Sequence, residues 1–198
     1  VSYNNDDAFV ARGSARRRWR HRLLWRYYVA GISKVDLVLI YRDVNLSDVM
    51  KQGAKRARVL MPYFIPELHQ PPELTPTEAE NFATQVSFIG HFEDDGRGEC
   101  LLALARDGLR VRIYGGPTWS RWLATNRAAN ELEIRGPVYG KDYVRAVSAS
   151  SVSLAFLSKR NSDTYTRRSF EIPACGGLML SERTEDLTSL YASGEEAL

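Results

Sequence analysis

The strongest constraint on the fold is a regular alternation of short apolar segments and longer amphipathic segments after residue 82. The apolar segments lie at 86–90, 109–114, 132–134, 152–157 and 177–180. The segments with a helical pattern lie at 98–107, 120–126, 139–149, 166–174 and 185–192. Strands that alternate with helices of this length form right-handed βαβ units, which build a parallel sheet covered on both faces. We therefore expect an α/β fold over residues 82–198.

A smaller α/β region precedes this one. The apolar run 35–41 predicts a buried strand, followed by a helix that Asn45 caps. A second short strand is expected at 57–61, and five prolines then interrupt regular structure between residues 62 and 76. The expected organisation is a partial α/β domain, a proline-rich linker and a second domain. Their expected bounds are 1–66, 67–81 and 82–198.

Basic residues are concentrated near the N-terminus. Residues 1–60 contain 13 Lys and Arg against 5 Asp and Glu, whereas residues 61–198 contain 14 against 19. An arginine cluster of this kind can meet nucleic acid or an anionic membrane surface. Four apolar residues have helical spacing through the same stretch, which favours an amphipathic helix with a solvated basic face. They are Trp19, Leu23, Tyr27 and Ala30.

The composition, with 44% hydrophobic and 26% charged residues, is that of a globular protein. No apolar run approaches the roughly 20 residues that cross a bilayer. No signal peptide is recognisable at Val1, and we expect the natural N-terminus to lie upstream. Cys100 and Cys175 lie far apart without a CxxC pairing, so we expect free thiols, each in an apolar helical context, and no zinc site. These features favour a cytoplasmic protein, with a peripheral membrane location left open.

The stretch 163–177, DTYTRRSFEIPACGG, carries the most functional information. It follows an expected strand, and ligands of parallel sheets bind beyond the carboxyl ends of the strands. Asp163 and Glu171 lie eight positions apart, on either side of an expected helix start. Because proline is tolerated only in the first turn of a helix, Pro173 predicts that this helix begins near Phe170. A carboxylate can accept hydrogen bonds from both ribose hydroxyls, and backbone N–H groups at a helix start can hold a pyrophosphate. The chemistry suits a sugar nucleotide.

Glu171 is the expected ribose clamp. We expect its carboxylate to be open to a cleft, beside Gly176 and the loop at Gly90, rather than buried in an ion pair. Arg167 and Arg168 are close enough in sequence to hold the pyrophosphate. The alternative for Glu171 is an acid that only stabilises the start of a helix.

Several motifs together resemble one enzyme family. They are YNNDD at 3–7, YRDVN at 41–45, YFIPELH at 63–69, FIGH at 88–91, RSFEIPACGG at 168–177 and SERTE at 181–185. With these motifs, nearly the whole chain resembles the spore-maturation-protein-type (CgeB-like) GT-B glycosyltransferases. The resemblance implies a Rossmann-like nucleotide-sugar donor domain at 82–198, truncated at its end, and the end of an acceptor-side domain at 1–66.

The implied reaction transfers a sugar from a nucleoside-diphosphate sugar to an acceptor hydroxyl on a glycan, protein or lipid. The family implies retention at the anomeric carbon and a site without metal or cofactor. The adjacent acids Asp6-Asp7 and Asp94-Asp95 do not form a DxD metal pair. The resemblance makes Asp163 and His91 the catalytic candidates, Asp163 facing the donor sugar. The implied donor-binding residues are Glu171, Gly90, Arg97, Tyr114, Gly115, Pro137, Val138, Arg168, Gly176 and Gly177.

Alternatives remain for several of these residues. His91 is as readily a structural histidine as a phosphate or sugar contact. Gly176 and Gly177 can serve a tight helix-to-strand turn instead of phosphate approach. Two other functions stay open: a nucleotide-sugar-binding module without turnover, because the chain alone can be inactive, and a nucleic-acid-binding α/β protein. Basic patches interleaved with aromatics are missing elsewhere, so no specific nucleic acid is expected.

Overall fold

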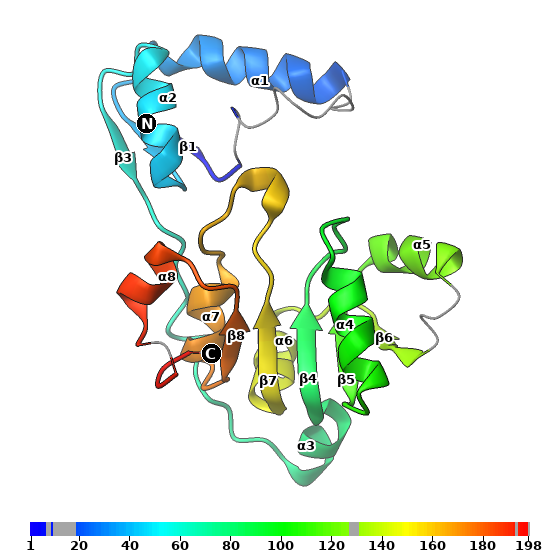
Figure 1. Cartoon of the computed structure of the whole chain (residues 1–198). Coiled ribbons are helices and arrows are strands. Elements are labelled where there is room, and N and C mark those ends of the chain that lie inside the picture. The colour runs from blue at the N-terminus through cyan, green and yellow to red at the C-terminus, as the bar shows by residue number, and fades with distance from the viewer. Residues whose placement is uncertain (7–8, 10–18, 127–130, 193, 198) are drawn as a thin grey trace. The chain divides into compact units, whose positions relative to one another are not determined.

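The computed structural model describes residues 1–6, 9, 19–126, 131–192 and 194–197 (Figure 1). The chain divides into two compact units. The first comprises Val1–Pro62 together with Ser158–Thr164, and the second comprises Tyr63–Leu157 with Tyr165–Leu198. The segment 158–164 is therefore grouped with the N-terminal unit, although it follows a strand of the second unit.

The first unit is a small parallel sheet with helices. Its strands, in the order β1-β2-β3, are β1 (Ser2–Asn4), β2 (Val38–Ile40) and β3 (Ala57–Val59). Its helical elements are α1 (Trp19–Ile32), η2 (Asp43–Asn45), α2 (Leu46–Lys51) and η4 (Lys159–Asn161). Asn45 precedes α2 as expected, but its side chain makes no capping bond. The core gathers around Ile32, Val38, Ile40, Val49 and Ala54.

The helix expected in the arginine-rich stretch is present as α1, but its expected apolar face is wrong. Leu23 and Tyr27 are 42% and 70% exposed. The residues that pack on the core are Ile32 together with the partly buried Tyr28 and Val29. Tyr28 and Ile32 are four positions apart and form the stripe that faces the sheet, so the other stripe turns to solvent.

The second unit contains a five-stranded parallel sheet of order β6-β5-β4-β7-β8, which confirms the expected parallel α/β architecture. The strands are β4 (Thr84–Ile89), β5 (Val111–Tyr114), β6 (Glu133–Arg135), β7 (Ser150–Ala155) and β8 (Met179–Ser181). The helices are α3 (Pro76–Phe82), α4 (Arg97–Arg106), α5 (Pro117–Thr125), α6 (Gly140–Ser148), α7 (Arg168–Ala174) and α8 (Glu185–Leu190). Figure 1 shows α4 in front of the sheet and α6 behind it.

The central strands explain why this region folds around one core. Nearly every residue of β4 and β5 is buried, as expected for strands covered on both faces. Phe88 of β4 packs edge-on against Trp119 and Phe156, with ring centroids 5.8 and 5.2 Å apart. Leu101 of α4 and Ile113 of β5 are fully buried in the same cluster.

The proline-rich stretch contains a helix that the expected linker does not include. Thr75 and Glu78 form a capping box at the start of α3, with Pro76 in its first turn. Glu78 also pairs with Arg145 of α6 at 2.7 Å. The contacts of α3 thus place it in the second unit, at whose edge the prolines shape an ordered segment.

Helix α7 begins at Arg168, earlier than the expected start near Phe170. Pro173 lies inside the helix and cannot donate a hydrogen bond to the carbonyl of Ser169. The hydroxyl of Tyr191 donates to that carbonyl instead, at 2.7 Å. This substitute bond explains how α7 tolerates the proline.

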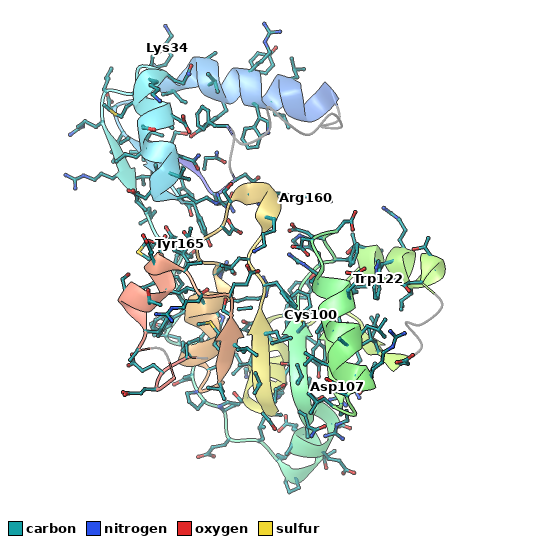
Figure 2. All side chains as sticks on the ribbon, viewed as in Figure 1. Lys34, Cys100, Asp107, Trp122, Arg160 and Tyr165 are labelled. Carbon is teal, nitrogen blue, oxygen red and sulfur yellow. The ribbon has the colours of Figure 1, made fainter. Side chains whose placement is uncertain are left out.

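Both cysteines are free, as expected. Cys175 is buried, but Cys100 lies on the exposed side of α4 (Figure 2), so the expected apolar surroundings are wrong for Cys100. In the described part of the chain, no helix has the length and apolar character needed to cross a membrane.

Candidate functional site at the carboxyl edge of the second sheet

The loops that follow the parallel strands of the second unit meet at one edge of its sheet. Gly90 and His91 lie in the loop after β4, and Arg97 is the first residue of α4. Tyr114 ends β5, and Gly115 follows it. The loop after β6 carries Pro137 and Val138. These predicted donor-binding residues therefore share the edge at which ligands of such sheets bind.

Arg97 does not point toward a ligand. Its side chain is 4% exposed, and its guanidinium donates to both carboxylate oxygens of Asp95, at 2.8 and 2.6 Å. A further N–H donates to the carbonyl of His91 at 2.9 Å, and the guanidinium lies 5.7 Å from the ring centroids of Phe88 and Phe156. The expected phosphate contact through this side chain is wrong, because its donors hold the loop together.

His91 itself stays accessible at this edge. Its side chain is 67% exposed, and its Nε2 lies 2.9 Å from Oε1 of Glu93, which is 9% exposed. An exposed imidazole that is held by a buried carboxylate has a fixed ring orientation. His91 thus presents an exposed ring at this edge, and a contact of that ring with a ligand stays a prediction.

The glycines of this edge serve packing. A Cβ on Gly115 would come within 2.1 Å of the Trp119 ring, and a Cβ on Gly90 within 2.7 Å of the Phe88 ring. The indole N–H of Trp119 also donates to the carbonyl of Gly90 at 2.8 Å. The close approach at Gly90 and Gly115 is therefore to aromatic side chains of the core.

The expected base-binding region has two different parts. The side chain of Tyr114 is 1% exposed, so only its backbone can meet a base. Pro137 is exposed and Val138 half-buried, in the loop between β6 and α6. A base read through backbone groups at this loop stays a prediction.

Glu171 lies in the first turn of α7, but its carboxylate is not open. The residue is 8% exposed, and its Oε1 forms an ion pair with Nε of Arg167, 2.5 Å away. Nε2 of His69 lies 3.7 Å from the same oxygen. The expectation of a carboxylate free of ion pairs is therefore wrong.

Two further side chains define the surroundings of Glu171. His69 accepts a hydrogen bond from the N–H of Ile65 at Nδ1, so a neutral ring carries its proton on Nε2, which faces Glu171. The ring of His69 packs edge-on against Tyr143 at 5.9 Å. Burial, together with the negative charge of Glu171, raises the pKa of Tyr143. These contacts orient the carboxylate from the protein side.

Arg168 and the two glycines of the motif lie at opposite ends of α7. Arg168 begins the helix, and its buried Nε has no hydrogen-bond partner among the described residues. Gly176 and Gly177 follow the helix and precede β8, at the amino edge of the sheet. Gly176 has a φ of 75°, and a Cβ on Gly177 would come within 2.5 Å of Val147. The expectation that Glu171 lies beside Gly176 at the ligand edge is therefore wrong, and the turn role of the glycines is supported.

Asp163 belongs to the first unit. Its carboxylate accepts hydrogen bonds from Nε of Arg42 at 2.7 Å and from Nη2 of the same residue. Arg42 also donates to the carbonyl of Asn5 at 2.8 Å. Among the described residues, Ser162 is the only non-glycine with positive φ, at 52°, next to Asp163. A left-handed backbone at such a residue stores strain, which is common at functional sites.

The sequence did not reveal Arg42, His69, Glu93 or Tyr143 as part of these arrangements. Glu93 stands two positions after His91, a spacing that could have been noticed. Arg42 lies 121 positions from Asp163, so no local pattern predicts their pairing. Within the described ranges, no cluster of three or more His, Cys, Asp or Glu is arranged to hold a metal ion.

The fold class is the expected one, α/β with parallel sheets, as in GT-B glycosyltransferases. The glycosyl transferase-like family matches residues 97–198, and the chain belongs to this family. The matched region includes Glu171, Asp163 and the loops after β5, β6 and β8. No curated protein matches the sequence significantly.

Solved structures share this fold at low sequence identity. HepE of Anabaena, in a complex with UDP-glucose, superposes with a TM-score of 0.67 at 13% identity, over 97% of this chain and 56% of that one. Sucrose-phosphate synthase of Thermosynechococcus elongatus gives 0.62 at 15% identity, over 90% and 49%. AviGT4, a glycosyltransferase involved in avilamycin A biosynthesis, gives 0.52 at 14% identity, over 87% and 63%. The chain thus spans between 49% and 63% of these structures.

Proposed function

We propose that the chain is the donor-binding region of a glycosyltransferase of the spore-maturation-protein type. The proposed reaction transfers a sugar from a nucleoside-diphosphate sugar to an acceptor hydroxyl. The observation that carries the proposal is the carboxylate of Glu171, held in the first turn of α7 within the region that matches the glycosyl transferase-like family. UDP-glucose is the first donor to test, because HepE binds it.

The ribose of the donor is proposed to donate its hydroxyls to Glu171. Oε1 is paired with Arg167, whose side chain is 50% exposed and whose guanidinium carbon lies 5.4 Å from the ring centroid of Tyr63. An ion pair with a half-exposed partner contributes only about 0–1 kcal/mol, so ribose hydroxyls can replace or share it at low cost. Charge-assisted hydrogen bonds from the hydroxyls contribute about 1.5–3 kcal/mol each.

The diphosphate is proposed to lie near the start of α7. A released Arg167 and the Arg168 side chain, whose Nε lacks a described partner, supply positive charge there. Sugar transfer is then accelerated because the donor and acceptor are positioned and the leaving diphosphate is stabilised, without a metal or a cofactor. Asp163 and His91 are the residues that we propose to face the transferred sugar, with retention of the anomeric configuration.

Donor binding and turnover are separate tests. Nucleoside-diphosphate sugars, beginning with UDP-glucose, should raise the Tm of the protein in a thermal-shift screen, because ligands stabilise the state that binds them. Failure of every such donor to bind would contradict the proposal. Binding without sugar transfer to any acceptor, in the intact polypeptide, would identify a binding module without turnover.

A further inference from the structure

We propose that Glu93 is a positioning residue, whose buried carboxylate fixes the ring of His91 so that Nδ1 is presented to the donor sugar. The inference rests on the proposed function, because it takes the loop between β4 and α4 as part of the donor site. The role of Glu93 follows from the contacts of the loop.

The first step is the contrast in exposure between the two side chains. His91 is 67% exposed and Glu93 is 9% exposed, with 2.9 Å between Nε2 and Oε1. An exposed side chain without such a bond samples several rotamers. Because the carboxylate is the fixed end of the pair, the hydrogen bond sets the orientation of the imidazole.

The second step is that the carboxylate is itself held. Nη2 of Arg97 lies 3.8 Å from Oε2 of Glu93, while Nη1 of the same guanidinium donates to the carbonyl of His91 at 2.9 Å. Asp95 binds the guanidinium in two places, and the whole group is buried. The N–H of Phe92 donates to Oγ1 of Thr118 at 3.1 Å, which anchors the loop to α5. The buried guanidinium of Arg97 thus holds the backbone of His91 directly, and it holds the ring of His91 through Glu93.

The third step concerns the tautomer. An ionised carboxylate can only accept hydrogen bonds, so the neutral imidazole carries its proton on Nε2. The lone pair then lies on Nδ1, which has no hydrogen-bond partner within the described ranges. A sugar hydroxyl is a suitable donor to this nitrogen. Burying a carboxylate costs desolvation energy, and an apolar residue at position 93 would pack without that cost. Packing alone therefore does not explain why position 93 holds an acid.

The loop offers a matched control. Asp94 is the neighbouring acid, and it is exposed. Asp94→Asn removes one negative charge from the same loop without touching the pair. Glu93→Leu removes the acceptor, and Glu93→Gln keeps an oxygen that can accept from Nε2.

The experiment measures kcat/KM of the intact polypeptide with its donor, together with the ¹⁵N shifts of the His91 ring. We expect about a 100-fold loss for His91→Ala and about a 10-fold loss for Glu93→Leu, within the ranges for proton-transfer groups and for coupled neighbours. Glu93→Gln should recover most of the loss in kcat/KM, and Asp94→Asn should match the unmodified protein.

Glu93→Leu should cause no further loss in the His91→Ala background, since Glu93 acts through His91. The ¹⁵N shifts should show protonation at Nε2 and a mixture of tautomers in Glu93→Leu.

Equal losses from Glu93→Leu with and without His91 would overturn the inference, because they indicate a role in folding only. An unchanged tautomer in Glu93→Leu would overturn it as well. Full activity in His91→Ala would also overturn it, while donor binding through Glu171 could stand. If no donor binds at all, the proposed function fails separately, and the tautomer measurement still decides whether Glu93 fixes the ring.

Discussion

Nε of Arg167, the residue that precedes α7, forms an ion pair with Oε1 of Glu171 in the first turn of that helix, at 2.5 Å. The acid proposed to hold the ribose is therefore already paired with a positive charge at the start of its own helix. His69 and Tyr143 lie against it from the protein side, whereas Arg167 is half exposed. The asymmetry matters for binding, because only the Arg167 side of the carboxylate can be exchanged for a ligand without repacking the core.

The pair of Arg42 and Asp163 should be important for stability as well as for any contact of Asp163 with the sugar. Both side chains are largely buried, at 4% and 11% exposure. Arg42→Met should lower the free energy of unfolding by about 3–5 kcal/mol, because it removes the guanidinium that compensates a buried carboxylate. Adding Asp163→Asn should recover part of that loss in urea denaturation.

Lys55 and Asp36 provide the control for this pair in the same unit, since both are well exposed at 2.9 Å separation. Lys55→Met should leave the denaturation midpoint unchanged. Equal effects of Lys55→Met and Arg42→Met would show that the buried pair has no special role.

The adjacent residues Gly115 and Gly116 allow a test of whether Gly115 is needed for packing. A Cβ on Gly115 meets the Trp119 ring at 2.1 Å, whereas a Cβ on Gly116 meets nothing within 4 Å. Gly115→Ala should destabilise the protein by about 1–3 kcal/mol through overpacking. Gly116→Ala should change the free energy of unfolding by less than about 0.5 kcal/mol. Thermal unfolding of the two variants decides this, and similar Tm values would contradict the close contact.

The two cysteines should differ in reactivity. Burial, with a contribution from Glu171, raises the pKa of Cys175 to about 12. The thiolate is the reactive form, and at pH 8 a thiol with that pKa is ionised in about one molecule in 10⁴. Iodoacetamide should therefore modify Cys100, which is exposed, well before Cys175 in the folded protein. Mass spectrometry after timed labelling measures both rates, and equal rates would contradict the burial of Cys175.

The parallel sheet of the second unit could be predicted because its strands and helices repeat a local pattern. The alternation around Val86, Val111 and Val152 is sufficient to indicate strand positions, and the crossover rule supplies their direction. The sequence analysis does not predict helix α3, because its prolines indicate irregular structure, although Thr75 and Glu78 have the spacing of a capping box.

The site was predictable only as an edge of the sheet. Which way a side chain turns depends on partners far away in sequence, so Arg97 could not be seen to turn inward onto Phe88 and Phe156. The burial of Glu171 depends in part on His69, about a hundred positions earlier. Local spacing identified the acid correctly as part of a helix start, but it could not predict its ion pair.

The central claim is that Glu171 binds the ribose of a nucleoside-diphosphate sugar, and calorimetry with two ligands tests it most directly. The ligands are UDP, or the nucleoside diphosphate that a screen identifies, and its 2′,3′-dideoxy analogue. The proteins are the unmodified chain, Glu171→Ala, and Glu80→Ala as an exposed control on α3. The unmodified chain and the control should bind the ribose form about 10- to 150-fold more tightly than the analogue, which corresponds to about 1.5–3 kcal/mol. Glu171→Ala should bind both forms with the weaker affinity while keeping its unfolding transition. An undiminished preference for the ribose form in Glu171→Ala would contradict the account.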